Sequence, residues 1–354
     1  MLNSPGEANI VIVTDAWLPQ VNGVVRTLSN TKQELERLGY HVTLITPQQF
    51  KTVACPGYSE IRLSLVLPRM LKQAILSSNP DYLHIATEGP LGIAARVLAV
   101  NQGWRFTTAY HTRFPEYLNA RYPWISTEKI YRLLRWFHGC SSAVLAPTEQ
   151  IIRTLRMNRF LQVRHWGRGV DHSLFKCLNP DRPINRVKPV FLYAGRVSIE
   201  KNLDDFLKLD LPGEKWVAGD GPMLATLKSR YPEVRWLGSK THPELAKVYN
   251  LADVFVFPSK TDTFGLVMVE AMACGLPVAA YPVIGPLDVV ESGRSGILSH
   301  NLRHACLKSL ELSRQQAIER ASQFNWKQAT QEFVRALVRM QSTMPLSNVQ
   351  HVIA

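Results

Sequence analysis

The chain lacks the sequence features that mark several common protein classes. It contains no Cys-x-x-Cys pair, and its five cysteines are scattered along the chain: Cys55, Cys140, Cys177, Cys274 and Cys306. This odd and unpaired set argues against a zinc ribbon or a disulfide scaffold, and it favours reduced thiols in a cytosolic protein. The loop after the first expected strand also lacks Gly-x-Gly-x-x-Gly, which argues against a dinucleotide-dependent oxidoreductase.

Long apolar runs are missing as well. The longest apolar stretch, around residues 265–287, is interrupted by Glu270, Pro277 and Pro282, so it cannot form a clean membrane span of about 20 residues. Residues 1–9 contain no basic region followed by an apolar core, and we therefore expect no signal peptide. With 46% hydrophobic and 19% charged residues, the composition is that of a globular protein, either soluble or bound to a membrane surface without crossing it.

Acidic residues are in short supply relative to basic ones. The chain has 41 Lys and Arg against 28 Asp and Glu, a net charge of +13. Such a field favours polyanions, which include nucleic acid, an anionic membrane and phosphorylated substrates. No recognised nucleic-acid-binding motif is present, so we expect no nucleic acid partner. At about 150 residues per domain, 354 residues predict roughly two domains.

Apolar runs alternate with helical patterns in two consecutive series. Short β-branched or aromatic runs of this kind are typical of strands buried on both faces of a parallel sheet. The expected strands are residues 10–13, 41–46, 82–85, 106–110 and 143–146, then 190–194, 215–218, 234–237, 254–257 and 277–280. A proline-rich linker at residues 175–189 separates the series. The pattern predicts an α/β protein of two doubly wound, Rossmann-like domains that face each other, with residues 1–180 in the first and 181–326 in the second.

Ligands of such sheets bind beyond the carboxyl ends of the strands, so candidate functional residues should follow the strands directly. The most informative segment runs from Asp262 to Glu270, with Phe264, Gly265, Leu266 and Val267 between the two carboxylates. Free backbone N–H groups at a loop and helix start suit a diphosphate. The later carboxylate can accept hydrogen bonds from a ribose and the earlier one from a sugar. The segment therefore matches all three parts of a nucleotide-sugar.

A second segment supplies two cations after the first strand of the second series. Arg196 and Lys201 lie five residues apart on one loop, where both can converge on one diphosphate. Charge-assisted contacts of this kind are strong, and in catalysis they would hold negative charge on a departing phosphate.

From residue 10 to about residue 340 the sequence resembles the retaining nucleotide-sugar glycosyltransferases of the GT-B fold, glycosyltransferase family 4. The family has a Glu-x7-Glu motif, and here Asp262 stands in the first position and Glu270 in the second. The resemblance implies that Arg196 and Lys201 bind phosphate, that Gly23 lies in a loop near the diphosphate, and that His111 faces the transferred sugar. It also implies that Gly219-Asp220-Gly221-Pro222 is a family loop with a structural role. It also implies that after Phe324-Asn325-Trp326 a last helix, residues 327–341, returns to the first domain and leaves residues 342–354 as a tail.

Two subgroups of the family look most similar. Tyr110-His111-Thr112-Arg113-Phe114-Pro115-Glu116-Tyr117 resembles sulfoquinovosyl-diacylglycerol synthases and related diacylglycerol glycosyltransferases, and the stretch from Pro19 to Val24 resembles GDP-mannose-dependent α-mannosyltransferases. Both imply a lipid acceptor but disagree on the nucleotide. Mixed basic, aromatic and leucine-rich stretches agree with binding at an anionic membrane surface on its cytoplasmic side. These stretches are residues 61–75, 121–125 and 131–137.

The sequence thus predicts retaining transfer of a hexose from a UDP- or GDP-sugar to a lipid such as diacylglycerol. A saccharide acceptor and a nucleotide-sugar epimerase of the same fold remain alternatives. No Asp-x-Asp motif occurs, so we expect no metal ion and no other cofactor. No further carboxylate is an obvious nucleophile. We therefore expect the acceptor to attack from the face that the phosphate leaves, and not through a covalent intermediate.

Overall fold

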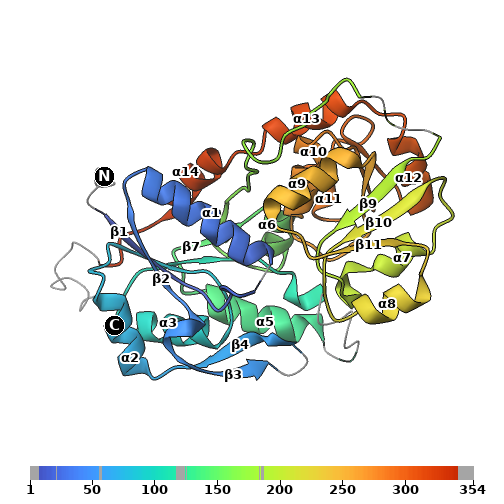
Figure 1. Cartoon of the computed structure of the whole chain (residues 1–354). Coiled ribbons are helices and arrows are strands. Elements are labelled where there is room, and N and C mark those ends of the chain that lie inside the picture. Colours follow the sequence, from blue (N-terminus) through green and yellow to red (C-terminus); the bar gives the residue numbers. More distant parts are fainter. Residues whose placement is uncertain are drawn as a thin grey trace.

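The computed structural model describes residues 8–20, 22–55, 58–116, 124, 126–182, 184 and 187–341. They form two halves, each with a six-stranded sheet between helices (Figure 1). The expected fold class, two doubly wound Rossmann-like units of GT-B type, is confirmed. Every pair of neighbouring strands in these two sheets is parallel.

The first sheet has the strand order β2-β1-β5-β6-β7-β8. Its strands are β1 (Asn9–Val13), β2 (His41–Ile45), β5 (Tyr82–Ile85), β6 (Thr107–Ala109), β7 (Ala143–Ala146) and β8 (Val163–His165). Four of the five expected strands agree within a residue, and β6 is shorter by one residue at each end. The interiors of β1, β5 and β7 are buried because helices cover both faces of the sheet, and this is why these strands read as continuous apolar runs.

The second sheet has the order β11-β10-β9-β12-β13-β14. Its strands are β9 (Val190–Ala194), β10 (Glu214–Ala218), β11 (Arg235–Gly238), β12 (Val254–Phe257), β13 (Val278–Ala280) and β14 (Gly296–Leu298). Strand β9 pairs with β12, so the direction of winding changes between them. The loops after β9 and β12 therefore part around a crevice, the usual ligand position in open α/β sheets.

Helices cover both sheets. Those of the N-terminal half are α1 (Gly23–Arg37), α2 (Pro68–Leu76), α3 (Pro90–Asn101), α5 (Thr127–His138) and α6 (Glu149–Met157). Those that follow are α7 (Leu203–Leu207), α8 (Leu224–Arg230), α9 (His242–Leu251), α10 (Leu266–Ala273), α11 (Pro286–Val289), α12 (Leu302–Ser309), α13 (Arg314–Ser322) and α14 (Trp326–Ala336). Single turns of 3-10 helix span Pro47–Gln49 and Ile199–Lys201. An antiparallel hairpin of β3 (Lys51–Cys55) and β4 (Tyr58–Leu65) was not predicted from the sequence.

Helix α14 lies against α1, in the N-terminal half (Figure 1). Its Phe333 is fully buried in the apolar core that also contains Ile10, Leu28 and Trp166. The chain crosses between the halves twice at one place, because Val170 and Asn325 form a parallel β-bridge. None of the helices that the structure describes is long and apolar enough to span a bilayer.

Candidate active site

Lys201 and Asp262 meet at the crevice between the loops that follow β9 and β12. The Lys201 Nζ lies 2.6 Å from Asp262 Oδ1, although 61 residues separate them. Burial by itself would raise the pKa of Asp262, but the Lys201 ammonium and its hydrogen bond outweigh burial and hold this pKa below its ordinary value. The other carboxylate oxygen, Asp262 Oδ2, is buried and has no partner among the described residues. It is therefore an available acceptor for a ligand hydroxyl.

Helix α10 begins directly beside this pair. Gly265 caps it in the left-handed region with φ +86°, and a Cβ at this position would lie 2.7 Å from Met268 Cε and 3.0 Å from the Phe257 ring. Only glycine fits both the dihedral angle and the space. In the part of the chain that the structure describes, the N–H groups of Leu266 and Val267 donate to nothing. They leave an anion-binding position at the helix start.

Glu270 lies one turn further along α10 and is 3% exposed. Its Oε1 is ion-paired with Arg26 of α1, and its Oε2 accepts a 3.4 Å hydrogen bond from the Tyr249 hydroxyl. Burial raises the pKa of Glu270, and Arg26 only partly offsets this. The sequence did not single out Arg26, because its partner lies on a helix of the other half.

His111 follows β6 and is 9% exposed. Its backbone oxygen accepts a 2.9 Å hydrogen bond from Thr263 Oγ1, which joins it to the Asp262–Glu270 segment across the two halves. Its Nδ1 lies 3.3 Å from Arg168 Nη2, and its Nε2 is buried without a partner in the described structure. Burial, and then the charge of Arg168, lower the pKa of His111 well below its ordinary value, so the ring is neutral.

The remaining predicted residues occupy the expected loops. Gly23 begins α1, is exposed, and a Cβ there would meet nothing within 4 Å. Its φ is not positive, so no backbone requirement explains the glycine. Arg196 is half-buried on the loop after β9, where its backbone oxygen accepts a 2.8 Å hydrogen bond from the Tyr193 hydroxyl. Phe264 is buried and its ring contacts Phe324 with 5.6 Å between centroids.

The Gly219-Asp220-Gly221-Pro222 loop supports the loop that contains Arg196. A Cβ at Gly219 would lie 1.8 Å from the backbone oxygen of Gly195, and a Cβ at Gly221 would lie 2.4 Å from that of Val197. The Val197 N–H also donates to the Asp220 backbone oxygen at 2.8 Å. These close backbone approaches explain both glycines without any contact to a ligand.

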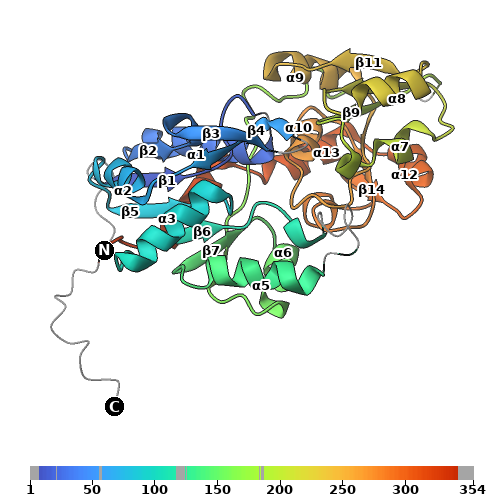
Figure 2. The same cartoon turned by 90° about the horizontal axis from the view of Figure 1, so that it is seen from below.

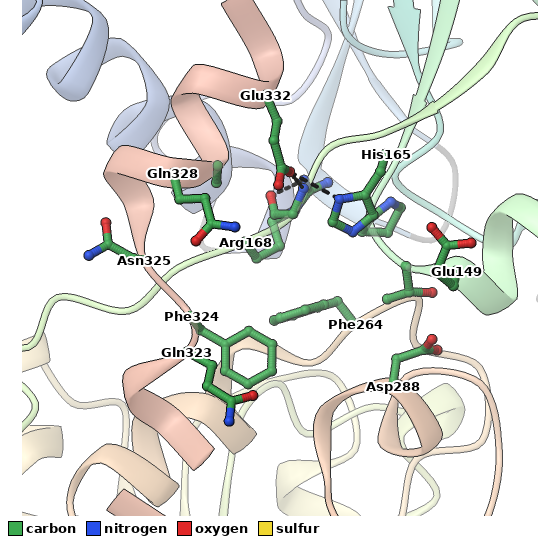
Figure 3. Close-up of a pocket in the computed structure, with 14 residues that line it drawn as sticks. Glu149, His165, Arg168, Phe264, Asp288, Gln323, Phe324, Asn325, Gln328 and Glu332 are labelled. Carbon is green, nitrogen blue, oxygen red and sulfur yellow. Dashed lines mark hydrogen bonds and ion pairs between the residues drawn. The ribbon is translucent and has the colours of Figure 1, made fainter. Parts of the chain in front are cut away.

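A cavity of about 210 Å³ lies between the halves, next to the segment that crosses from α13 to α14 (Figure 3). In Figure 3, Phe264 and Phe324 line one side of this cavity, and Arg168, His165 and Glu332 line the opposite side. Asp288, Gln323 and Gln328 add polar groups. Sequence reasoning did not predict this cavity, because its lining comes from five separate segments.

The assembled site can bind an anion and several hydroxyl groups at once. It combines free N–H groups at a helix start, a lysine held at a carboxylate, a second carboxylate inside the helix, and a neutral histidine from the opposite half. Two doubly wound halves, with these groups gathered at the crevice of the second sheet, are typical of glycosyltransferases of the GT-B type.

Comparison with known proteins identifies the family. The family model for Glycosyltransferase Family 4 matches residues 21–174, and that for Glycosyl transferases group 1 matches residues 178–308. The chain belongs to these GT-B glycosyltransferases, as its motifs predicted.

Similar proteins span most of the chain. A GDP-mannose-dependent alpha-mannosyltransferase of Mycobacterium tuberculosis is 28% identical over 82% of this chain and 83% of its own length. A sulfoquinovosyl transferase of Arabidopsis thaliana is 29% identical over 78% of this chain and 61% of its own length. An alpha-monoglucosyldiacylglycerol synthase of Streptococcus pneumoniae is 27% identical over 85% and 78%. The sucrose-phosphate synthase structure from Thermosynechococcus elongatus has the same fold, with a TM-score of 0.74, 20% identity, and coverage of 93% of this chain and 98% of that one.

Proposed function

We propose that this glycosyltransferase moves a hexose from a UDP- or GDP-sugar to a hydroxyl group of a membrane lipid such as diacylglycerol, with retention of the anomeric configuration. The observation that carries the proposal is the convergence of the Lys201–Asp262 pair, the open start of α10 and His111 on one crevice. The crevice lies where the winding of the second sheet changes direction, which is where such sheets bind ligands.

Each part of a nucleotide-sugar has a matching group. The free N–H groups of Leu266 and Val267 and the cations of Arg196 and Lys201 would hold the diphosphate, with the exposed start of α1 at Gly23 beside it. Glu270 would accept hydrogen bonds from the ribose hydroxyls. Asp262 Oδ2 and the His111 Nε2–H would contact the hexose, because both are buried and otherwise unpartnered.

Retention would follow from attack on the face that the phosphate leaves. The bond from the anomeric carbon to the phosphate oxygen breaks, the bond to the acceptor oxygen forms, and the acceptor proton passes to the leaving phosphate. Cations or backbone N–H groups stabilise the ionised carboxylates of Asp262, Glu270 and Asp15, which makes them weaker nucleophiles and disfavours a covalent intermediate. Asp262 is paired with Lys201 and Glu270 with Arg26, while Asp15 accepts hydrogen bonds from the N–H groups of Leu91 and Gly92 at the start of α3.

We also propose that the transfer needs no metal ion. The Lys201 ammonium, the Arg196 guanidinium and the positive end of α10 would supply the positive charge that a divalent cation supplies in other transferases. The sequence also contains no Asp-x-Asp motif. Turnover should therefore continue in EDTA, and loss of turnover that Mg²⁺ or Mn²⁺ restores would contradict this part of the proposal.

The lipid acceptor is supported by apolar side chains that neighbouring helices of the N-terminal half expose to solvent. Helix α3 packs against α2. It also contacts α5, because Arg96 of α3 donates to the Trp136 backbone oxygen at 2.9 Å. We call this surface the α2–α3–α5 face. Its exposed apolar residues are Leu67, Met70, Val97, Val100, Leu133 and Trp136. In Figure 2, α3 and α5 extend along the same side of this half.

The structure corrects part of the membrane-contact prediction. In residues 131–137, Tyr131, Leu134 and Phe137 are buried in the core, whereas Leu133 and Trp136 are exposed, together with the cation Arg132. Helical spacing explains the division, because only one side of α5 faces the sheet. In residues 61–75, Leu71 and Ile75 are likewise buried. Of residues 121–125, all except Trp124 lie outside the described residues.

We propose that the α2–α3–α5 face docks on the cytoplasmic side of an anionic membrane. Basic residues near such a surface contribute about 1 kcal/mol each, and exposed apolar side chains add burial in the interface. The protein should sediment together with vesicles of phosphatidylcholine and phosphatidylglycerol. Leu67→Ser and Leu133→Ser should each lower the bound fraction. Leu178→Ser, at a similarly exposed site in the linker, is the control and should leave the bound fraction unchanged.

The relatives support a lipid acceptor but leave the nucleotide open. The names of the alpha-monoglucosyldiacylglycerol synthases include the lipid, and those of the mannosyltransferases include GDP-mannose as the donor. We would offer UDP-glucose, UDP-galactose and GDP-mannose separately, with vesicles that contain or lack diacylglycerol, and measure nucleotide release and glycolipid formation. Release that requires one donor and diacylglycerol, and that Glu270→Ala abolishes, is the expected result.

A saccharide acceptor is the second candidate, and the cavity beside Phe264 favours it. Ring faces combined with amide and carboxylate groups are chemically suited to sugars, and this cavity has Phe264, Phe324, Gln323, Gln328 and Asp288. In the same assay, donor turnover that diacylglycerol does not increase, but that a soluble glycoside does, would select this candidate. Conversion of the donor without any acceptor would instead indicate an epimerase.

A further inference from the structure

Arg168 is a buried arginine without an ion-pair partner among the described residues. It is 5% exposed, and its guanidinium lies over the Trp166 ring at 4.5 Å. Its Nη1 donates to the backbone oxygens of Trp166 at 2.6 Å and Gly167 at 2.9 Å. Burial lowers the pKa of Arg168 to about 9, so it remains charged at neutral pH. Burying a cation is costly, which requires a reason for its presence here.

The Nη2 of Arg168 contacts the Nδ1 of His111 at 3.3 Å. A guanidinium can only donate, so this Nδ1 is the unprotonated nitrogen and the proton of the neutral ring lies on Nε2. That Nε2–H is the atom left without a partner in the described structure. Arg168 therefore fixes the position of the proton that His111 would offer to the donor sugar.

The backbone on both sides of Arg168 is held by the returning helix α14. The Gly167 N–H donates to Glu332 Oε2 at 2.8 Å, and Glu332 also pairs with His165 at 3.0 Å (Figure 3). A Cβ at Gly169 would lie 2.2 Å from the Trp326 backbone nitrogen. This close approach allows only glycine. The guanidinium thus extends from a segment that is fixed at both ends.

We propose that Arg168 is a positioning residue for the transfer reaction: it holds neutral His111 in the Nε2–H tautomer and directs this donor into the crevice. This inference rests on the proposed function, which places the donor sugar at His111. Arg168 does not touch the sugar, and its effect passes through the His111 ring. Burial disfavours the imidazolium form of His111, and the positive charge of Arg168 adds to this effect.

The first test is spectroscopic and needs no substrate. In protein labelled with ¹⁵N-histidine, long-range ¹H–¹⁵N correlation reports which ring nitrogen bears the proton, and the His111→Gln variant assigns the signal. We expect an unprotonated Nδ1 and a protonated Nε2 in the full chain from pH 8 down to pH 5. In Arg168→Met the Nδ1–H form should become detectable, and the ring should titrate closer to the ordinary histidine range.

The second test separates positioning from stability. Arg168→Met should lower kcat by about 10- to 100-fold, the value of one hydrogen bond to a charged group, with little change in the donor KM. Arg168→Lys retains a cationic donor and should recover part of this loss. Arg314→Met is the matched control, because Arg314 is also a buried arginine that donates to backbone oxygens, those of Gly275 and Ala252, but it lies at the start of α13 and does not contact His111.

An unchanged His111 tautomer and titration in Arg168→Met would overturn the proposal. So would a changed tautomer with unchanged kcat, or equal losses of kcat in Arg168→Met and Arg314→Met. Arg168→Lys decides the question if Arg168→Met fails to fold. A full chain that transfers no sugar from any donor would refute the proposed function, whereas the spectroscopic comparison would still decide whether Arg168 controls His111.

Discussion

Arg26 of α1 is ion-paired with Glu270 of α10, so the first helix of the N-terminal half engages a carboxylate inside the other half. The Arg26 side chain is 17% exposed and that of Glu270 is 5% exposed. Since Glu270 is also the proposed ribose acceptor, the donor has to share or displace this contact. The pair thus links the position of α1 to the donor site.

Removing Arg26 should destabilise the protein because it leaves a buried carboxylate without its cation. We expect Arg26→Met to lower the free energy of unfolding by about 1–3 kcal/mol. Lys32→Met is the control on the same helix. It breaks an exposed pair with Glu36, and such pairs contribute only about 0.3–0.5 kcal/mol. Urea unfolding of Arg26→Met, Glu270→Gln and the double variant measures the coupling, and a coupling free energy of zero would refute the pair.

Removing Lys201 should mainly lower the rate of transfer. We expect Lys201→Met to reduce kcat by about 100-fold or more, because it removes charge from the departing phosphate. It should also raise the pKa of Asp262, since burial then acts on that carboxyl without the lysine to oppose it. The acid limb of the pH–rate profile should therefore move to higher pH.

Lys260→Met is the matched control for Lys201→Met. The Lys260 ammonium lies nearby but pairs with Asp205 at 3.0 Å and is half-exposed. Its removal should leave kcat and the acid limb nearly unchanged. Equal effects of the two substitutions on nucleotide release would show that Lys201 has no special position at the leaving group.

Two glycines of the proposed diphosphate site should respond differently to alanine. Gly265→Ala places a methyl group against Met268 at φ +86°, and we expect it to cost about 1–2 kcal/mol of stability and to weaken nucleotide binding. Gly23→Ala meets open space at a helix start, and its stability should be unchanged or higher by up to about 1 kcal/mol. Calorimetric titration with UDP and GDP then tests Gly23. Weaker binding supports a ligand at this loop, and unchanged binding would remove Gly23 from the site.

His84 and His165 should make the free energy of unfolding depend on pH in opposite directions, because the fold lowers the pKa of His84 and raises that of His165. Burial lowers the pKa of His84 to about 3, so only the unfolded chain binds its proton and stability falls as the pH drops below 6.5. Between pH 7 and 5.5 this amounts to about 1 kcal/mol, and His84→Gln should remove it. A pH dependence of His84→Gln identical to that of the unsubstituted protein would contradict the assignment.

His165 has the opposite sign. Its hydrogen bond to Glu332 raises the pKa of His165 above the ordinary value, so its contribution is fully present below pH 6.5 and is lost as the pH rises through the folded-state pKa. His165→Gln should therefore destabilise the protein at pH 6 more than at pH 9. Thermal unfolding across this range measures the difference, and an equal loss at both pH values would argue against the pair with Glu332.

Ten of the twelve parallel strands could be predicted from sequence because burial on both faces leaves an unbroken apolar run, as in Val254–Phe257. The edge strands β8 and β14 were missed, because each has only three residues and is partly exposed. The β3–β4 hairpin was missed because it lacks this burial on both faces. It forms its own two-stranded sheet outside the main one, and exposed side chains such as Val53 and Leu65 interrupt any simple pattern.

Candidate site residues could be placed individually, because each follows a recognisable strand. Their contacts could not be predicted, since the neighbourhood of Lys201 and Asp262 depends on the pairing of β9 with β12. Arg26 and Arg168 gave no signal at all. An arginine in a helix or a loop is ordinary until its partner, Glu270 or His111, is brought to it by the fold.

The most direct test of the proposed function is the anomeric configuration of the lipid product. The protein would be incubated with UDP-glucose, UDP-galactose or GDP-mannose and diacylglycerol vesicles, and the purified glycolipid examined by NMR at its anomeric proton. We predict one α-linked hexose, matching the α-linkage of the donor, and no product with Glu270→Ala. A β-linked product would contradict retention, and nucleotide release without any glycolipid would contradict the lipid acceptor.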